Sequence, residues 1–266
     1  MRARNPPFEV ARALAWGPMG EALVQLRDLT KRFGTTEALV GLSCELQPGE
    51  VVGLLGPNGA GKTTTLKLLL GMLRPSAGSA TVLGLDCTTQ SREVKEQIGY
   101  CPDEPAFYDF LTGRETLDFA IEVRGLDREA AWKRLDPMMQ ALAFGSELDL
   151  LVSGYSLGMK KKLAVLAALV HDPRVLFLDE PTNGLDPPTA AHLRTLLRER
   201  ATERGTAVLL STHLLDMASR LCDRLLLLNH GRLIAQGTVD ELRERAALGK
   251  EALLEEAFLA LVSTPE

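Results

Sequence analysis

Residues 56–63, Gly-Pro-Asn-Gly-Ala-Gly-Lys-Thr, match the phosphate-loop pattern G-x-x-x-x-G-K-[ST] at every fixed position. Glycines without side chains let successive backbone N–H groups converge on phosphate oxygens, and the dipole of a following helix adds positive potential. Lys62 is expected to reach the β- and γ-phosphates of a nucleotide, and the Thr63 hydroxyl to ligate Mg²⁺. The residues expected to bind the nucleotide here are Gly56, Pro57, Asn58, Gly59, Ala60, Gly61, Lys62, Thr63 and Thr64.

Two adjacent acids, Asp179 and Glu180, end the apolar run 175–178. Burying them would be costly unless they served a cation or a reaction. Asp179 is expected to hold Mg²⁺ through water, and Glu180, on the other side of the strand end, to polarise an attacking water as a general base. The alternative is that both acids merely end a strand at the surface, and the complete phosphate loop elsewhere in the chain disfavours it.

The elements that must position these residues follow from the hydrophobic pattern. Residues 51–55 predict a buried strand before the loop, and residues 62–73 predict a helix after it, which the segment 74–78 stops. This strand–loop–helix order is the context that a phosphate loop requires, and it disfavours a glycine-rich turn with a chance Lys-Thr. Nearer the start of the chain, residues 23–33 and 38–46 predict two strands of an N-terminal antiparallel β layer.

The rest of the chain divides into a helical part and an alternating part. Residues 112–170 contain no convincing strand and show helical periodicity, with breaks expected around Gly125, Pro137 and residues 153–154. The sequence therefore predicts an α/β fold: a P-loop NTPase core of mostly parallel sheet, an N-terminal antiparallel β layer and a helical insertion subdomain. The later predicted elements are strands at 175–178, 207–210, 225–228 and 232–235 and helices at 189–204, 214–221, 239–247 and 251–261.

Composition and charge narrow the class of protein. Of the 266 residues 45% are hydrophobic, enough for a substantial core, and 30 Lys and Arg nearly balance 35 Asp and Glu. The net charge of −5 gives no global positive field, so we expect no nucleic-acid partner. Four well-separated cysteines without a CxxC pair indicate reduced, mostly buried thiols of a cytosolic protein. Apolar runs stay well below the roughly 18 residues of a membrane-spanning helix.

Residues 155–162 indicate which protein family the chain resembles. They read Tyr-Ser-Leu-Gly-Met-Lys-Lys-Lys and resemble the L-S-G-G-Q signature of the ATP-binding subunits of ABC (ATP-binding cassette) transporters. Leu157 stands where the family usually has Gly, and Met159 where it often has Gln. Ser156 and Gly158 match, and the resemblance implies that they bind nucleotide. Ser156 is also an ordinary N-cap for the helix predicted after it, and the two roles are compatible because a capped helix N-terminus binds anions.

Further matches follow in the order of the family. Residues 180–186 resemble the end of the Walker B motif and the D-loop, which implies a nucleotide contact by Asp186. Residues 211–213, Ser-Thr-His, resemble the switch-histidine motif, which implies that His213 contacts the γ-phosphate; a structural histidine at a strand end is the alternative. The catalytic residues implied are Glu180, His213 and Lys62.

Two other positions are compared with the family. Phe33 matches the aromatic that stacks on adenine, although an aromatic there is equally a core residue. Asp103 stands where the Q-loop of the family has Gln. An Asp is shorter, negatively charged and without N–H donors, so it can approach Mg²⁺ or its water but cannot donate to the γ-phosphate. The predicted metal ligands are therefore Thr63, Asp179 and Asp103.

The resemblance covers about residues 23–237 and implies an ATP-binding, ATP-hydrolysing subunit, with ATP and Mg²⁺ as cofactors, that powers a separate transmembrane permease at the cytoplasmic face of the membrane. Each motif occurs once, so a complete site implies head-to-tail pairing with a second copy or a homologous ATPase subunit. The tail is similar to exporters whose permease is a separate chain. The alternatives are a soluble ABC ATPase acting on ribosomes or DNA, and a slowly hydrolysing nucleotide switch.

The expected division of the chain has three parts: a loosely ordered extension at 1–22, an ABC ATPase domain at 23–237 and a helical tail at 238–266. Strand-like sequence begins only at Leu23, so Met19 is an alternative start. Charged residues and a proline interrupt the weakly apolar patch near the start of the chain, which argues against a signal peptide.

Overall fold

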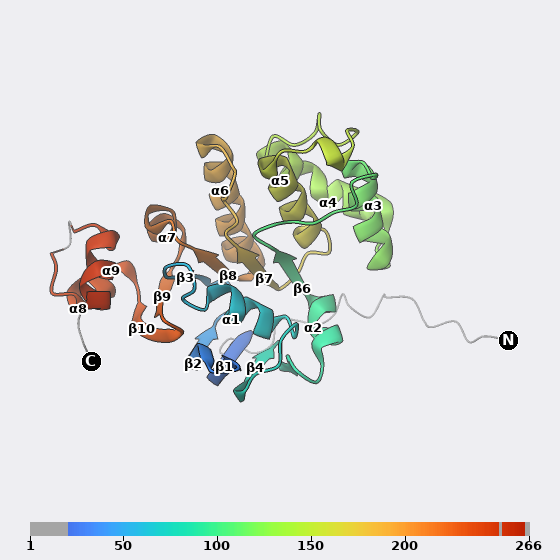
Figure 1. Ribbon diagram of the computed structural model, residues 1–266. Helices are drawn as coiled ribbons and strands as arrows, with labels where there is room; N and C mark the ends of the chain where they lie inside the picture. Colours follow the sequence, from blue (N-terminus) through green and yellow to red (C-terminus); the bar gives the residue numbers. More distant parts are fainter. Residues whose placement is uncertain (1–20, 250–251, 264–266) are drawn as a thin grey trace.

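The computed structural model of the protein describes residues 21–249 and 252–263 (Figure 1), so the predicted extension lies almost wholly outside the described residues. In the described part, one sheet has six strands in the order β10-β9-β3-β8-β7-β6. Every pairing in it is parallel except that of β10 with β9, which confirms the predicted mostly parallel core. The strands are β3 (Val51–Leu55), β6 (Ile98–Cys101), β7 (Val175–Asp179), β8 (Ala207–Thr212), β9 (Arg224–Asn229) and β10 (Arg232–Gly237).

The three central strands β3, β8 and β7 are buried at every residue, because helices and the second sheet cover both faces. Alternate residues face two cores: Val52 and Leu54 pack with the second sheet and α1 (Lys62–Leu69), whereas Val51 and Leu55 pack with the helices of the opposite face. In Figure 1, α1 lies between the two sheets. The parallel strands end at one edge, which is where the phosphate loop and the paired acids were predicted.

The second sheet has the order β2-β1-β4-β5 in the described residues, and its pairings are antiparallel. The strands β1 (Val24–Phe33) and β2 (Thr36–Leu46) confirm the predicted layer, whereas β4 (Ala77–Val82) and β5 (Leu85–Asp86) were not predicted. The segment 74–78 was predicted to stop a helix, and the structure adds that its residue 77 already pairs with Thr30 of β1. Gly78, with φ of +76°, lets the backbone approach Asp28, whose carbonyl oxygen would lie 2.3 Å from a Cβ there.

The helix α1 ends earlier than predicted, at Leu69 rather than 73. The chain reverses at Gly71, with φ of +61°, where a Cβ would lie 2.3 Å from the carbonyl oxygen of Cys87. A short helix, α2 (Ser91–Gln97), then leads into β6. The four cysteines of the chain are all free and buried, as predicted.

The helical subdomain consists of α3 (Gly113–Val123), α4 (Arg128–Ala141) and α5 (Leu157–Leu169), grouped beyond the edge strand β6 (Figure 1). The predicted break at Pro137 is wrong, because this residue lies inside α4. Lys133, whose carbonyl loses its N–H partner to the proline, is exposed, and so is Pro137, so the missing hydrogen bond lies at the surface.

The remaining helices are those predicted, with shifted bounds: α6 (Pro187–Arg204), α7 (Leu215–Leu221), α8 (Val239–Arg245) and α9 (Leu254–Ser263). The last, α9, packs against α7, α8 and β10. Among the described residues no helix combines the length and the apolar character needed to cross a membrane. The proposed boundary between domain and tail after residue 237 stays a prediction.

His171 joins the helical subdomain to the sheet. Its Nε2 lies 3.0 Å from the carbonyl oxygen of Ile98, which only accepts, so Nε2 carries the proton and donates. Its Nδ1 is buried and has no hydrogen-bond partner among the described residues. Burial, reinforced by the positive charges of Arg124 and Arg134, lowers the pKa of His171 to about 3.

Acid should therefore destabilise the protein through His171. The unfolded chain takes up a proton near pH 6.5 and the folded chain only near pH 3, so this stability is complete above pH 6.5 and declines as the pH falls between these values. For one proton the loss is about 1.4 kcal/mol per pH unit. We expect His171→Gln to show a shallower pH dependence of the unfolding free energy in urea titrations, with the exposed His192→Gln as control. Equal slopes for His171→Gln and the wild type would contradict this.

Candidate functional site

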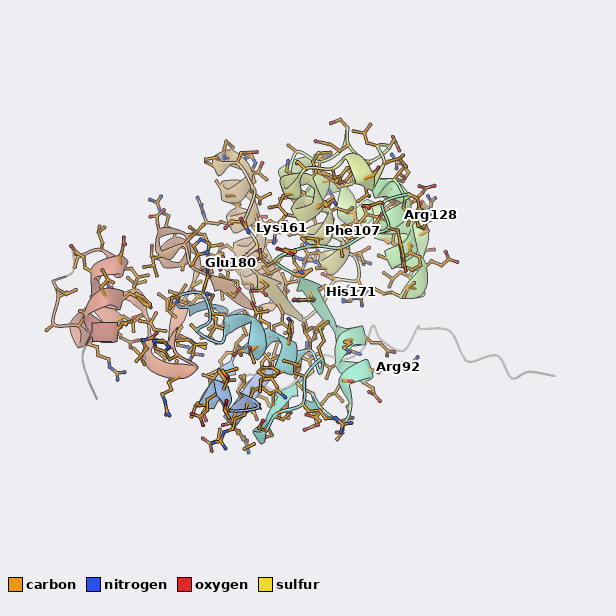
Figure 2. All side chains as sticks on the ribbon, in the orientation of Figure 1. Arg92, Phe107, Arg128, Lys161, His171 and Glu180 are labelled. Atoms are coloured by element: carbon orange, nitrogen blue, oxygen red, sulfur yellow. The ribbon has the colours of Figure 1, made fainter. Side chains whose placement is uncertain are left out.

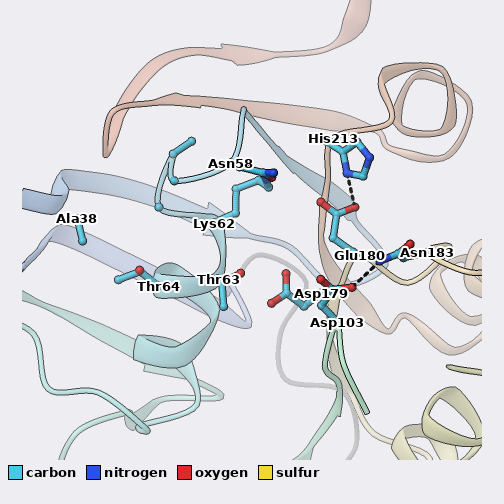
Figure 3. Close-up of a pocket in the computed structure, with 13 residues that line it drawn as sticks. Ala38, Asn58, Lys62, Thr63, Thr64, Asp103, Asp179, Glu180, Asn183 and His213 are labelled. Atoms are coloured by element: carbon cyan, nitrogen blue, oxygen red, sulfur yellow. Dashed lines mark hydrogen bonds and ion pairs between the residues drawn. The ribbon is translucent and has the colours of Figure 1, made fainter. Parts of the chain in front are cut away.

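A pocket of about 320 Å³ lies at the edge where the parallel strands end (Figure 3). Residues 58–64 of the phosphate loop and the start of α1 form one wall. The other lining residues come from four separate segments of the chain, and they are Ala38, Asp103, Asp179, Glu180, Asn183 and His213. The fold thus brings the predicted phosphate loop, acids and histidine to one place.

The phosphate loop joins β3 to α1, as the pattern predicts. Gly61 caps α1 with φ of +104°, and a Cβ there would lie 2.6 Å from the carbonyl oxygen of Ala38, so only glycine fits. Buried Lys62 donates from Nζ to the carbonyl oxygens of Gly56 at 2.6 Å and Pro57 at 3.2 Å. Burial lowers the pKa of Lys62, and the carboxylates of Glu180, Asp179 and Asp103 oppose this shift. The ammonium therefore lies at the loop, where phosphate oxygens could replace the two carbonyls.

The paired acids are held by the neighbouring strand β8. Buried Ser211 donates from Oγ to Asp179 Oδ1, and both its Oγ and its carbonyl oxygen lie 3.1 Å from the backbone N of Glu180. Glu180 has φ of +45°, a conformation that is strained for a residue with a side chain, and it turns the two carboxylates apart. His213 Nδ1 lies 3.0 Å from Glu180 Oε2 (Figure 3). Ser211 stands inside the switch-histidine motif, but it was not among the residues predicted from the sequence.

Asp103 and Asp179 lie on one wall of the pocket, and Thr63 lies on the opposite wall. The three predicted metal ligands therefore share one cavity. Its Oδ1 accepts a hydrogen bond of 3.1 Å from Asn183 Nδ2 and lies 3.5 Å from Lys161 Nζ. Lys161 and Asn183 were not predicted from the sequence. Lys161 is one of three consecutive lysines, which usually indicate a solvated surface. Asn183 belongs to the motif at 180–186, in which no separate role was predicted for it.

Six predicted nucleotide contacts do not line this pocket, and two of them, Gly56 and Pro57, begin the phosphate loop. Ser156 caps α5, with Oγ accepting from Met159 N at 3.2 Å, and Gly158 lies beside Gly184. Asp186 caps α6 by accepting from Thr189 N at 2.8 Å, and this hydrogen bond lowers the pKa of Asp186. Phe33, at the end of β1, has 48% of its surface exposed, so the alternative that it is a core residue is wrong. Their nucleotide contacts stay predictions.

A glycine-rich loop between a buried parallel strand and a helix, facing two acids at the end of a neighbouring strand, defines a P-loop nucleotide-binding protein. Comparison with known proteins names the family: the model of the ABC transporter family matches residues 39–183. The chain belongs to the ATP-binding subunits of ABC transporters, and the predicted fold class and family are confirmed.

Relatives and solved structures agree with this family. The chain is 37% identical to an uncharacterised ABC transporter ATP-binding protein, YdbJ, of Bacillus subtilis (strain 168), over 86% of this chain and 75% of that protein. It is 40% identical to Nod factor export ATP-binding protein I of Burkholderia lata, over 85% of this chain and 74% of that protein. A solved structure of an ATP-binding subunit of an ABC transporter superposes with a TM-score of 0.85 at 32% identity, covering 91% of this chain and all of the other.

Proposed function

We propose that the chain hydrolyses ATP with Mg²⁺ and drives a separate membrane permease by pairing head to tail with a second ATPase subunit. The observation that carries the hydrolytic part is the pocket, in which Lys62 faces Glu180 and His213. A phosphate-binding cation and a carboxylate base on opposite walls are the parts that phosphoryl transfer to water requires.

The proposed reaction uses groups of the chain at each step. Lys62 exchanges its two carbonyl partners for β- and γ-phosphate oxygens and neutralises part of their charge. Glu180 accepts a proton from water as the water oxygen attacks the γ-phosphorus, and the bond from that phosphorus to the bridging oxygen breaks to give ADP and phosphate. His213 binds one carboxylate oxygen of Glu180 and so leaves the other free for water.

The oxygen donors of the pocket fit Mg²⁺. Within the described residues no group of three or more His, Cys, Asp or Glu side chains forms a metal cage of its own. Mg²⁺ at nucleotide sites uses one or two protein oxygens together with phosphates and water, so a complete cage is not needed. Thr63, Asp179 and Asp103 would hold the ion, which when bound neutralises charge on the phosphates.

Pairing with a second ATPase subunit is supported by where the signature residues lie. Ser156 and Gly158 are absent from the lining of the described pocket, although the family resemblance gives them a nucleotide contact. Ser156 instead begins α5 with an exposed surface. A second copy of the chain, or a homologous subunit, would present these residues to the pocket of the first.

A permease partner is supported by the names of the relatives, which are subunits of transporters and exporters rather than proteins of ribosomes or DNA. An exposed aromatic cluster adds a physical reason. Tyr108 stacks near Phe110 and Phe119 with ring centroids 5.5 and 6.0 Å apart, and the three rings are 56%, 74% and 48% exposed. Apolar surface of this kind marks protein contacts, and it follows the Asp103 loop in the chain. We therefore propose attachment to the cytoplasmic face of the membrane through this permease.

The proposal is tested first by phosphate release from the purified chain with ATP and Mg²⁺, together with light scattering of the ATP-bound protein. Release of phosphate at a steady rate supports the ATPase, and ATP binding without release would favour the nucleotide switch instead. Co-purification from membranes tests the partner, since recovery without any integral membrane protein would contradict it.

Ser211→Ala should lower the hydrolysis rate about tenfold or more without abolishing ATP binding. The substitution leaves buried Asp179 without its Oγ donor and Glu180 N with one acceptor fewer, at a cost of about 1–3 kcal/mol in holding both acids. Phosphate release under saturating ATP measures the effect. Thr212→Ser, on the same strand, is the control because it keeps the hydroxyl that Leu214 N donates to. A Ser211→Ala rate equal to that of this control would remove Ser211 from the site.

A further inference from the structure

Lys161 is a lysine with no exposed side-chain surface, on the side of α5 that faces the sheet (Figure 2). Its Nζ donates to the carbonyl oxygens of Pro102 at 3.0 Å, Asp103 at 2.5 Å and, more weakly, Asp179 at 3.4 Å. It also lies 3.5 Å from Asp103 Oδ1. The three N–H donors of the ammonium are thus directed at the loop after β6 and at the end of β7, and both segments contribute residues to the pocket.

A buried ammonium is a costly way to fill space. Removing the charge from water costs several kcal/mol unless its partners compensate fully, and an apolar side chain of similar volume is often equally stable there. The groups that Lys161 holds are the backbones of Asp103 and Asp179, whose side chains line the pocket. A cation at this point fixes both acids and balances their charge, which a hydrophobic residue cannot do.

The same helix begins at the signature residues. Ser156 is the N-cap of α5 and lies five residues before Lys161, about 7.5 Å along a helix axis. A rigid helix of this length moves as a unit, so a displacement of its N-terminus reaches Lys161. The helix α5 therefore links exposed Ser156, at its N-terminus, to the pocket of the same chain, which Lys161 contacts.

A second set of contacts links the N-terminus of α5 to Asp103. Leu157 packs against Gly184, where a Cβ would lie 2.8 Å from Leu157 Cγ, and Gly158 lies so close to this loop that its own Cβ would be 2.6 Å from the Gly184 carbonyl oxygen. Asn183, the residue before Gly184, donates to Asp103 Oδ1. Both contacts lead from the start of α5 to Asp103, and the unusual Leu157 forms one of them.

We propose that Lys161 is a positioning residue that couples the N-terminus of α5 to the acids of the chain's own pocket, and so connects the two ATP sites of a pair. The proposal rests on the proposed function, in which Ser156 completes the site of the second subunit. ATP bound there shifts α5, and Lys161 transmits the shift to Asp103 and Asp179 of the first site. Hydrolysis then responds cooperatively to ATP.

The test uses the full chain and three variants. Lys161→Met keeps the length of the side chain and removes its charge and its N–H donors, whereas Lys161→Arg keeps the charge and the donors. Lys160→Met changes the neighbouring, partly exposed lysine and is the control. Phosphate release is measured against ATP concentration for kcat, KM and the Hill coefficient. We expect Lys161→Met to lose about tenfold in kcat, with KM changed less than threefold and a Hill coefficient near 1. Lys161→Arg should recover part of kcat and of the Hill coefficient, and Lys160→Met should match the wild type.

A second readout does not depend on hydrolysis. In the wild type, ATP should slow hydrogen exchange at the start of α5 and at the amides of Asp103 and Glu104 together; in Lys161→Met the two segments should respond independently. If the wild type binds ATP without releasing phosphate, the proposed function fails while the exchange experiment still tests the coupling. The proposal would be overturned if Lys161→Met kept the wild-type kcat and Hill coefficient, or if the wild type were not cooperative. It would also be overturned if ATP still slowed hydrogen exchange in the two segments together in Lys161→Met. If Lys161→Met does not fold, Lys161→Gln replaces it.

Discussion

Glu180→Gln should lower the rate of ATP hydrolysis by at least about 100-fold, because a general base contributes about 10²–10⁴ to such a rate and an amide cannot accept the proton. The substitution keeps the shape of the side chain and its contact with His213, since an amide also offers an oxygen to the imidazole N–H. ATP binding should remain within a fewfold of the wild type. Phosphate release and ATP affinity, measured on the same preparation, separate the two effects.

The same variant tests the pairing of subunits. When hydrolysis is blocked, ATP should hold two chains together, so light scattering should report a dimer with ATP and Mg²⁺ and a monomer without them. Glu203→Gln, on the exposed face of α6, is the matched control and should hydrolyse at the wild-type rate. A Glu180→Gln protein that releases phosphate within threefold of the control would show that another group is the base.

Much of the core could be predicted from the sequence because burial on both sides leaves a continuous apolar run. β3 and β7 follow this rule, and each ends at residues whose chemistry is evident from type and spacing. β4 does not follow it. Its sequence, Ala-Gly-Ser-Ala-Thr-Val, has weak strand preference, and it forms because β1 offers a free edge for pairing. Such a contact is invisible to any local pattern.

The candidate site divides in the same way. Lys62, Asp179 and His213 stand at fixed points of motifs, so their types and spacing were sufficient to predict them as site residues, and all three line one pocket. Lys161 follows another lysine and precedes a third, and a run of charge usually indicates a solvated helix face. Its burial depends on how α5 packs against β6, which no periodicity of α5 alone reveals. Asp103 was predicted from the sequence to approach Mg²⁺, and in the structure its carboxylate already has Asn183 and Lys161 as partners.

Lys62→Met should abolish measurable ATP binding, with a loss of affinity of at least about 100-fold. Among the described residues that line the pocket, Lys62 is the only lysine or arginine, and three carboxylates also line it, so its loss leaves the triphosphate near these acids without a lysine or arginine side chain. Two charge-assisted hydrogen bonds of about 1.5–3 kcal/mol each correspond to about 10² to 10⁴ in affinity. Fluorescent ATP titration measures the loss, with the exposed Lys67→Met on the same helix as control.

The stability of the ligand-free protein distinguishes a lost ligand contact from a damaged fold. In the structure Lys62 is buried against two carbonyl oxygens, and burial already disfavours its charge, so a methionine of similar length removes a desolvation cost together with those two bonds. We therefore expect Lys62→Met to melt within a few degrees of the wild type without nucleotide, and to lose the rise in melting temperature that ATP gives the wild type. An unchanged ATP-induced rise would mean that backbone N–H groups of residues 58–63 bind the phosphates without the ammonium, and that the cation serves the transition state alone.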